Sequence, residues 1–308
     1  MRAATSTLPT RVTVVEVGPR DGLQNEAQRV PTPVKIELIE RLAQAGITKI
    51  EAAAFVSPKW VPQMADGDEV LTQVRRRPGT AYAALVPNLR GFEAALAARA
   101  DEVVVFSAAS ETFCRKNINC SIAESIERFA PVCEAARRAG IPVRGSISCS
   151  LGCPYEGPIR PDAVAHVAQQ MKDVGVQLIG VADTIGVGTP RATQQAIAAV
   201  LAVFALPSVS GHFHDTYGQA LANVYACLQM GVATFDASVA GLGGCPFARG
   251  ATGNVATEDV LYLLEGLQIE TGIDLAQLVQ TGQWISGVLG RTATSRAGNA
   301  ISARSRAG

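Results

Sequence analysis

The chain has 308 residues, of which 48% are hydrophobic and 18% are charged, and its 27 basic and 27 acidic side chains balance at neutral pH. This balance offers no broad positive surface for nucleic acid or an anionic membrane, and the composition is too apolar for a disordered protein. Length alone suggests about two domains, although α/β barrels of about 250 residues fold as one.

Targeting signals and cysteine content are the features of the sequence that predict the cellular compartment. Residues 1–10 hold no apolar run of signal-peptide length, and the longest apolar run, 196–206, is too short to span a bilayer. The seven cysteines are odd in number, and no secretory signal accompanies them, which favours reduced thiols over a disulfide framework. We therefore expect a cytoplasmic protein that binds neither a membrane nor nucleic acid.

Strand-like and helix-like segments alternate along almost the whole chain. A first helix is expected over 32–46, with Thr32 as its N-cap, Pro33 at its first position and Gly46 just past its end. A second helical pattern runs from 119 to 140. Apolar strands are expected at 11–17, 47–55, 81–86, 102–107, 143–149, 177–183, 208–214 and 233–239.

Eight such repeats with short connections favour parallel strands, and strands that are apolar nearly throughout are typical of a sheet buried on both faces. An open doubly wound sheet is the alternative, but no glycine fingerprint follows the first strand. The run GLGGCP follows the last strand instead, and Pro246 stands where the third glycine would be. The fold class predicted is α/β, a (β/α)₈ TIM barrel with additional C-terminal helices.

The barrel is expected over about 11–255, followed by appended helices at about 256–270 and 274–289. No linker separates a second unit, so residues 1–308 are predicted to form a single catalytic domain. The tail from about 291 to 308 is rich in Arg, Ser, Ala and Gly, and we expect it to be frayed.

Polar side chains gather where the predicted strands end, and in such barrels these ends build the active site. They come from five of the eight strands or from the residues just after them: Arg20, Asp21, Glu51, Asp183, His212, His214, Cys245 and Asn254.

His212 and His214 are two of only three histidines, and residues two apart in a strand point to the same face. Two imidazoles with the carboxylate of Asp21 and the amide of Asn254 suit a six-coordinate divalent cation, Mg²⁺ or Mn²⁺. Zinc would more often take four ligands that include Cys or a third His. Each histidine could instead be a satisfied core residue, but a His-x-His pair at the end of a barrel strand favours the metal.

The remaining candidates have structural alternatives. Glu51 needs a buried partner, and a pair with Arg20 could be structural, catalytic or both. Asp183 could open a turn before Gly186. Cys245 could be an inert thiol, but its glycine-rich setting indicates a loop that closes over a substrate.

Long motifs between residues 11 and 290 resemble the 3-hydroxy-3-methylglutaryl-CoA lyase family. They are VEVGPRDGLQNE, FVSPKWVPQM, KNINCSI, SLGCPYEG, DTIGVGTP, HFHDTYGQALAN and VAGLGGCPFARGATGNVATEDVLYLLEGL. The resemblance implies a metal-dependent barrel enzyme that cleaves 3-hydroxy-3-methylglutaryl-CoA to acetyl-CoA and acetoacetate by retro-Claisen chemistry. It further implies an acyl-CoA substrate, a homodimer and a place in leucine degradation.

Carried over by position, the resemblance implies a metal set of Asp21, His212, His214 and Asn254. It implies catalytic roles for Arg20, Glu51, Asp183 and Cys245, and a position near the metal ligands for Glu258. The chain departs from the family at Ala52 to Ala54 and at Ser146, where smaller residues could widen the acyl pocket. A lyase for a longer 3-hydroxy-3-alkylglutaryl-CoA is therefore an alternative, ahead of a Claisen-type synthase and an inactive acyl-CoA binder.

Overall fold

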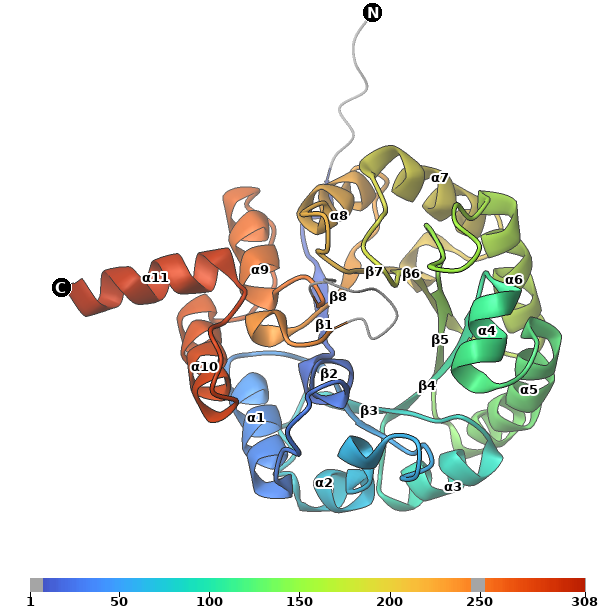
Figure 1. Cartoon of the computed structure of the whole chain (residues 1–308), viewed down its shortest axis with the longest axis horizontal. Helices are drawn as coiled ribbons and strands as arrows, with labels where there is room; N and C mark the ends of the chain where they lie inside the picture. The colour runs from blue at the N-terminus through green and yellow to red at the C-terminus, as the bar shows by residue number, and fades with distance from the viewer. Residues whose placement is uncertain (1–7, 245–252, 308) are drawn as a thin grey trace, which may run out of the picture.

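The computed structural model describes residues 8–244 and 253–307. Within them, eight parallel strands pair in sequence order and close into a barrel, because β8 pairs with β1 (Figure 1). The predicted (β/α)₈ barrel is confirmed, and closure excludes the open sheet. The strands are β1 Thr13–Glu16, β2 Lys49–Ala54, β3 Ala81–Leu85, β4 Glu102–Ala108, β5 Val143–Ser148, β6 Leu178–Asp183, β7 Val209–Phe213 and β8 Thr234–Ala237.

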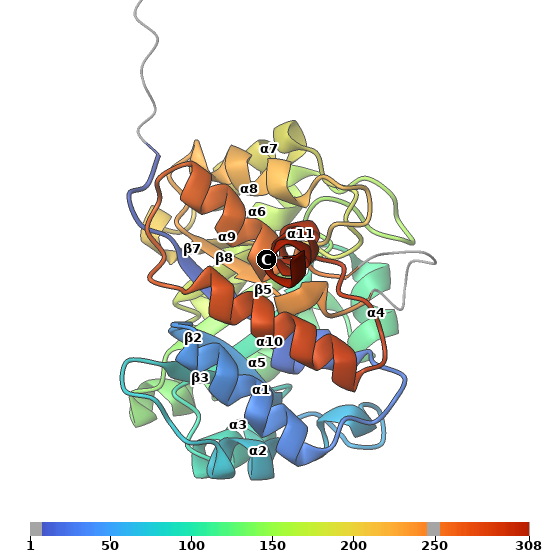
Figure 2. The same ribbon diagram turned by 90° about the vertical axis from the view of Figure 1, so that its left-hand side faces the viewer.

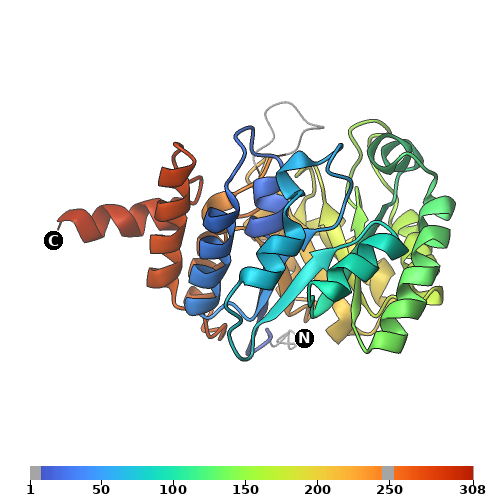
Figure 3. The ribbon, with the colours of Figure 1, turned by 90° about the horizontal axis from the view of Figure 1, so that it is seen from below.

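Helices surround the barrel and cover the outer face of its sheet (Figures 1 and 3). They are α1 Thr32–Gln44, α2 Gly67–Gln73, α3 Leu89–Ala97, α4 Glu111–Ile118, α5 Ile122–Ala139, α6 Pro161–Asp173, α7 Pro190–Leu201, α8 Ala220–Leu228, α9 Thr257–Gly266, α10 Leu275–Val288 and α11 Arg296–Ala307. Helix α9 is the next α-helix after β8 and packs beside α8, so it belongs to the ring, whereas α10 packs against both α9 and α1 (Figure 2).

Local sequence explains several helix ends. Ser121 caps α5 in a reciprocal pair with Glu124, and Asp274 caps α10 by accepting from the backbone of Gln277. At α1 the predicted cap is one residue off. Thr32 is the first helical residue and donates its hydroxyl to Asp66 on a neighbouring loop, a contact distant in sequence.

The C-terminal segment differs from the sequence prediction, because α11 forms where a frayed tail is expected. Asp259 in α9 accepts from the hydroxyl of Ser295 and from the backbone N–H groups of Arg296 and Ala297. This carboxylate caps a helix that begins about 37 residues later in the chain. The start of α11 is therefore not predicted by a cap in its own local sequence. Helix α11 then extends away from the barrel (Figures 1 and 3). Among the described residues, no helix combines the length and apolarity needed to cross a membrane.

The two faces of the barrel sheet differ in chemistry. Phe213 and Phe235 are buried on the outer face, and glycine at 211 leaves room for both rings. On the inner face, Glu51, Arg144 and Asp236 are buried and bonded to one another. The interior beneath the C-terminal ends of the strands is therefore charged, which is tolerated because each charge has a partner.

Candidate active site

A tight turn after β1 places the Arg–Asp pair at the barrel mouth. In this turn, η1 (Gly18–Gly22), the backbone N–H groups of Arg20, Asp21 and Gly22 all donate to the carbonyl of Val17. A side chain at Gly22 would come within 2.7 Å of Leu242, so the turn packs closely against the β8 side of the mouth. The glycines of the motif thus serve to bring two charged side chains together over the strand ends.

Strand β7 and the segment around Asn254 build the opposite wall. His212 lies in β7 and His214 just beyond it, with their ring centroids 5.3 Å apart, while Phe213 between them is buried outward. The backbone of Val255 donates to the carbonyl of Phe213, which aligns Asn254 with His214. The expectation that both imidazoles share a face is confirmed.

Asp21, His212 and His214 converge as a candidate metal centre. One ligand atom from each lies within 4.8 Å of the other two. Asn254 contacts the same carboxylate, since its Nδ2 donates to Asp21 at 2.8 Å and to the carbonyl of Leu242 at 3.2 Å. The Nδ1 atom of His214 is buried without a hydrogen-bond partner among the described residues, a costly state that a cation would relieve. These residues therefore fit a divalent ion.

Electrostatics keep Asp21 and His214 in the forms that bind a cation, whereas at His212 burial is outweighed by Asp236 and Asp21, which raise the pKa of that ring. Burial opposes ionisation of Asp21, but Arg20 and the two imidazoles outweigh it and hold the pKa of Asp21 well below its ordinary value. Burial and the neighbouring His212 lower the pKa of His214 to about 4, so this ring is neutral near pH 7. A carboxylate and a neutral imidazole are the species that ligate metals.

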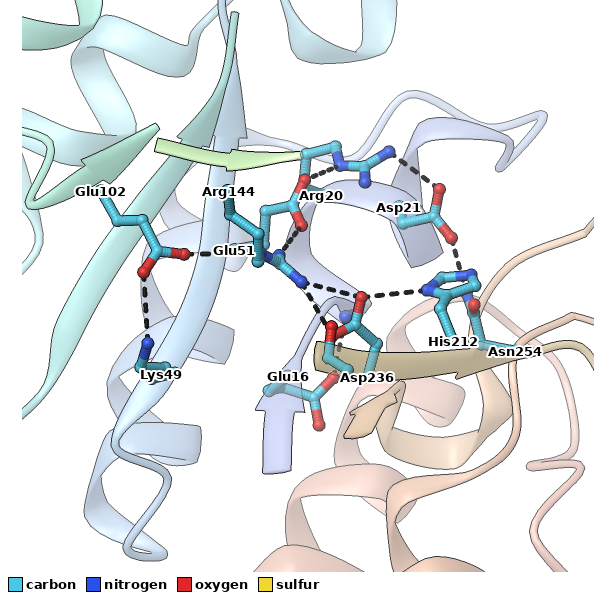
Figure 4. Close-up of polar contacts among 12 residues, drawn as sticks. Glu16, Arg20, Asp21, Lys49, Glu51, Glu102, Arg144, His212, Asp236 and Asn254 are labelled. Atoms are coloured by element: carbon cyan, nitrogen blue, oxygen red, sulfur yellow. Dashed lines mark hydrogen bonds and ion pairs between the residues drawn. The ribbon is translucent and has the colours of Figure 1, made fainter. Parts of the chain in front are cut away.

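Arg20 connects this centre to the barrel interior. Its Nε donates to Glu51 at 2.6 Å and its Nη1 to Asp21 at 2.8 Å, as Figure 4 shows. Burial opposes the charged form of Arg20, but Glu51 and Asp21 outweigh it and raise the pKa of the guanidinium. The predicted Arg20–Glu51 pair is therefore present, and it fixes a permanent cation at the mouth.

The structure does not bring Asp183 into the cluster. Its carboxylate is buried and accepts from the backbone N–H groups of Val187 and Gly188, at 3.1 and 2.8 Å, so it serves as the turn cap weighed above. Burial raises the pKa of Asp183 to about 6 despite these donors. Cys245 lies outside the described residues. A catalytic role for either stays a prediction.

Two charged residues of the network, Arg144 and Asp236, were not singled out from the sequence. Each interrupts an apolar strand, Arg144 in the stretch VRGSISC and Asp236 in ATFDASV. The same signal drew attention to Glu51, so a systematic search for charges inside buried strands would have found both.

Two further buried carboxyls hold the backbone where the glycine-rich segment begins. Glu16 accepts from the N–H groups of Gly18 and Val239 and from the hydroxyl of Thr257. Glu258 accepts from the N–H of Ala240. Without a cation partner, burial raises the pKa of Glu16 to about 7 and that of Glu258 to about 8.

Comparisons with known sequences agree with this picture. The family described as HMGL-like matches residues 11–285. A relative from Pseudomonas aeruginosa, named 3-hydroxy-3-isohexenylglutaryl-CoA/hydroxy-methylglutaryl-CoA lyase, is 58% identical over 96% of this chain and 99% of its own length. The mitochondrial hydroxymethylglutaryl-CoA lyase of Gallus gallus is 57% identical over 95% of this chain and 98% of its own.

Solved structures give the same result. The hydroxymethylglutaryl-CoA lyase of Pseudomonas aeruginosa superposes with a TM-score of 0.94 at 58% identity, covering 96% of this chain and 99% of that one. An HMG-CoA lyase from Acinetobacter baumannii in complex with coenzyme A and 3-methylmalate gives 0.91 at 37% identity, covering 97% and 96%. Fold and site together define a barrel enzyme of the lyase type. The chain belongs to the HMGL-like family, and the resemblance drawn from the motifs is confirmed.

The burial of Glu16 and Glu258 predicts that stability decreases as pH rises. In the folded protein their pKa values, about 7 and about 8, exceed the ordinary 4.5, so over this interval the folded state binds more protons than the unfolded state. Their contribution is full below pH 4.5 and is lost as the pH rises through 7 and then 8. We expect the free energy of unfolding to fall across this range in urea titrations.

Glu258→Gln supplies the comparison, because its amide is neutral at every pH. The difference in unfolding free energy between the variant and the wild type should shift in favour of the variant as the pH rises. Glu93→Gln, an exposed change in α3, should keep the wild-type slope. Equal slopes for the wild type and Glu258→Gln would contradict the assignment.

Proposed function

We propose that this protein is a carbon–carbon lyase that cleaves 3-hydroxy-3-methylglutaryl-CoA to acetyl-CoA and acetoacetate. The observation that carries the proposal is the convergence of Arg20 with Asp21, His212 and His214 at one barrel mouth. Relatives named for this reaction share more than half of the sequence over nearly its full length. The coenzyme A in the Acinetobacter baumannii structure supports an acyl-CoA substrate.

A divalent metal, Mg²⁺ or Mn²⁺, would be held by Asp21, His212, His214 and Asn254. Bound there, it would polarise substrate oxygens and make a nearby hydroxyl more acidic. The donor types support this assignment, and so does the buried Nδ1 of His214 described above. Asn254 would ligate through Oδ1, the other arm of the amide whose Nδ2 holds Asp21.

The chemistry requires that a proton leave the C3 hydroxyl while the C2–C3 bond breaks. The electron pair of that bond then moves into the thioester as an enolate, and C3 becomes the ketone of acetoacetate. Arg20 is suited to stabilise the enolate oxygen, because its contacts with Glu51 and Asp21 through Nε and Nη1 fix the guanidinium and leave the N–H groups of Nη2 to donate. Glu51 thus orients Arg20 rather than touching the substrate.

Asp183 and Cys245 are proposed for the two proton transfers. Each carboxylate oxygen of Asp183 accepts one backbone N–H, which leaves a lone pair on each for the C3 hydroxyl proton. Cys245, or a water that it holds, would return a proton to C2 of the departing acetyl-CoA enolate. The glycine-rich stretch around Cys245 supports a position close to the substrate.

A reducing compartment suits the thiols of this chain. None of the six described cysteines forms a disulfide and all are buried, which supports the cytoplasm as the proposed location. A homodimer and a role in leucine degradation are proposed from family likeness.

The proposed activity is tested with 3-hydroxy-3-methylglutaryl-CoA and an acetoacetate assay. We expect acetoacetate to form in the presence of Mg²⁺ or Mn²⁺, to cease after chelation and dialysis, and to return when either ion is added back. Formation at the same rate after verified metal removal would contradict the metal assignment. Failure to form acetoacetate under any metal condition would contradict the reaction itself.

Arg20→Met tests the role in enolate stabilisation. Loss of one charge-stabilising donor is worth about 3 kcal/mol, so kcat should fall roughly a hundredfold. Mn²⁺ affinity should be nearly retained, because Asn254 still holds Asp21. The matched control is Arg11→Met, which removes the exposed ion pair with Glu270. An increase in KM with unchanged kcat would exclude the enolate role.

A second substrate is favoured by the Pseudomonas aeruginosa relative, whose name includes the isohexenyl ester. Ser146 lies on β5 two residues after the inward-facing Arg144, and it pairs with Phe106 on one side and Gly180 on the other. Side chains two apart share a face, so Ser146 faces the barrel interior, where its small size leaves space for a longer alkyl group.

Comparison of kcat/KM on the methyl and isohexenyl esters tests this second function. We expect turnover of both, and we expect Ser146→Leu to lower kcat/KM for the longer ester at least about tenfold while sparing the methyl ester. Ile147→Leu, on the opposite face of the same strand, controls for general effects on packing. No turnover of the isohexenyl ester by the wild type would restrict the protein to the methyl substrate.

A further inference from the structure

A continuous chain of buried charges runs beneath the candidate active site and joins its two halves. Arg20 donates to Glu51, which also accepts from Nη2 of Arg144 at 2.8 Å. Nη1 of the same guanidinium donates to both oxygens of Asp236, at 2.8 and 2.9 Å. Asp236 in turn contacts Nδ1 of His212 at 3.2 Å. Figure 4 shows this sequence of contacts from Arg20 to His212.

Asp236 constrains which nitrogen of His212 carries the proton. The two residues face each other in the register of β7 and β8, and Asp236 is buried. Both of its oxygens accept from Nη1 of Arg144, as expected of an ionised carboxylate. An ionised carboxylate can only accept, so Nδ1 of His212 must be the donor. In the neutral ring, the lone pair is then on Nε2.

His214 provides a contrast within the same cluster. Its Nδ1 has no hydrogen-bond partner among the described residues, so no carboxylate fixes its tautomer from behind. Only one of the two imidazoles is therefore preset by the protein. Of the two imidazoles, His212 is therefore the one whose tautomer the protein fixes.

We propose that Asp236 is a positioning residue that, anchored by Arg144, holds His212 in the Nδ1–H tautomer and so presents Nε2 to the divalent ion. The proposal rests on the proposed metal function of the site. Carboxylate partners of metal-bound imidazoles generally fix ring orientation and raise ligand basicity, and their loss weakens metal affinity about 10- to 100-fold. Arg144 also binds Glu51, so the same guanidinium positions Arg20 and His212.

The cost of this network argues for such a role. Buried ion pairs are often no more stabilising than apolar residues of similar volume, so the buried charges of Glu51, Arg144 and Asp236 are not needed to fill the barrel. Other barrels commonly fill these inner layers with Val, Ile and Leu. Here the network of charges contacts two residues of the candidate site, Arg20 and His212. The proposed chemistry depends on the orientation of both side chains.

The first measurement needs no variant and no metal. Nitrogen-15 labelling of histidine in the metal-free protein gives three ring systems, from His166, His212 and His214. Two-bond proton–nitrogen spectra, recorded at a pH where His212 is neutral, identify its tautomer, and His212→Gln assigns its signals. We expect protonated Nδ1 and unprotonated Nε2. A His212 with its proton on Nε2 would overturn the proposal, whatever the enzyme's activity.

The second measurement uses Asp236→Asn. Its amide must turn its donor group toward Arg144 or toward His212, so the contact that fixes Nδ1–H is weakened or lost. We expect the Nε2–H form of His212 to appear and the Kd for Mn²⁺, measured by calorimetry, to rise about 10- to 100-fold. An unchanged tautomer together with an unchanged Kd in the folded variant would overturn the proposal.

Glu102→Gln is the matched control. Glu102 forms an ion pair with the same guanidinium, with 3.4 Å between its Oε1 and Nε of Arg144, and its other oxygen pairs with Lys49 rather than with a residue of the candidate metal centre. This change removes one negative charge from the network while retaining shape, and it should leave the tautomer and the Mn²⁺ affinity as in the wild type. An equal loss of affinity in Glu102→Gln would show a general charge effect and overturn the specific role of Asp236.

If the wild type itself binds no Mn²⁺, the metal proposal fails, while the tautomer experiment still reports on Asp236.

Discussion

The pairing of Arg20 with two carboxylates is the interaction on which the mouth of this barrel depends. A guanidinium presents its donors in a rigid fork, so binding Glu51 through Nε and Asp21 through Nη1 fixes its plane. Both carboxylates have other contacts, since Asp21 belongs to the candidate metal centre and Glu51 reaches into the barrel toward Arg144. One cation therefore holds the cluster and the interior in a single arrangement.

This arrangement explains why neighbouring opposite charges follow the first strand. The turn η1 directs three successive N–H groups to one carbonyl, which exposes Arg20 and Asp21 to the same space. The pair could neutralise itself at a surface turn and contribute little. At the mouth, Asp21 is drawn toward the imidazoles and Arg20 toward Glu51, so each charge acts on a different part of the site.

Strong periodic signals made most of the fold predictable from sequence. The eight strands and the barrel followed from repeated apolar segments, and the polar strand ends indicated where side chains would meet. Prediction failed where a partner lies far away in sequence. Thr32 is held by Asp66 rather than capping its own helix, and α11 is capped by Asp259 from another helix. Arg144 and Asp236 were missed although each is a single charge inside an apolar strand, the signal that pointed to Glu51, because neither lies in a local motif of polar residues.

Two kinds of buried carboxyl coexist around this mouth, and their surroundings explain the difference. Asp21 and Asp236 each contact a guanidinium, which keeps their pKa values low and the groups charged. Glu16 and Glu258 receive only backbone and hydroxyl donors, so burial dominates and raises their pKa values. Asp21 belongs to the candidate metal centre and Asp236 contacts His212 of that centre, whereas Glu16 and Glu258 anchor backbone. The protein thus separates carboxyls for chemistry from carboxyls for architecture by the placement of two arginines.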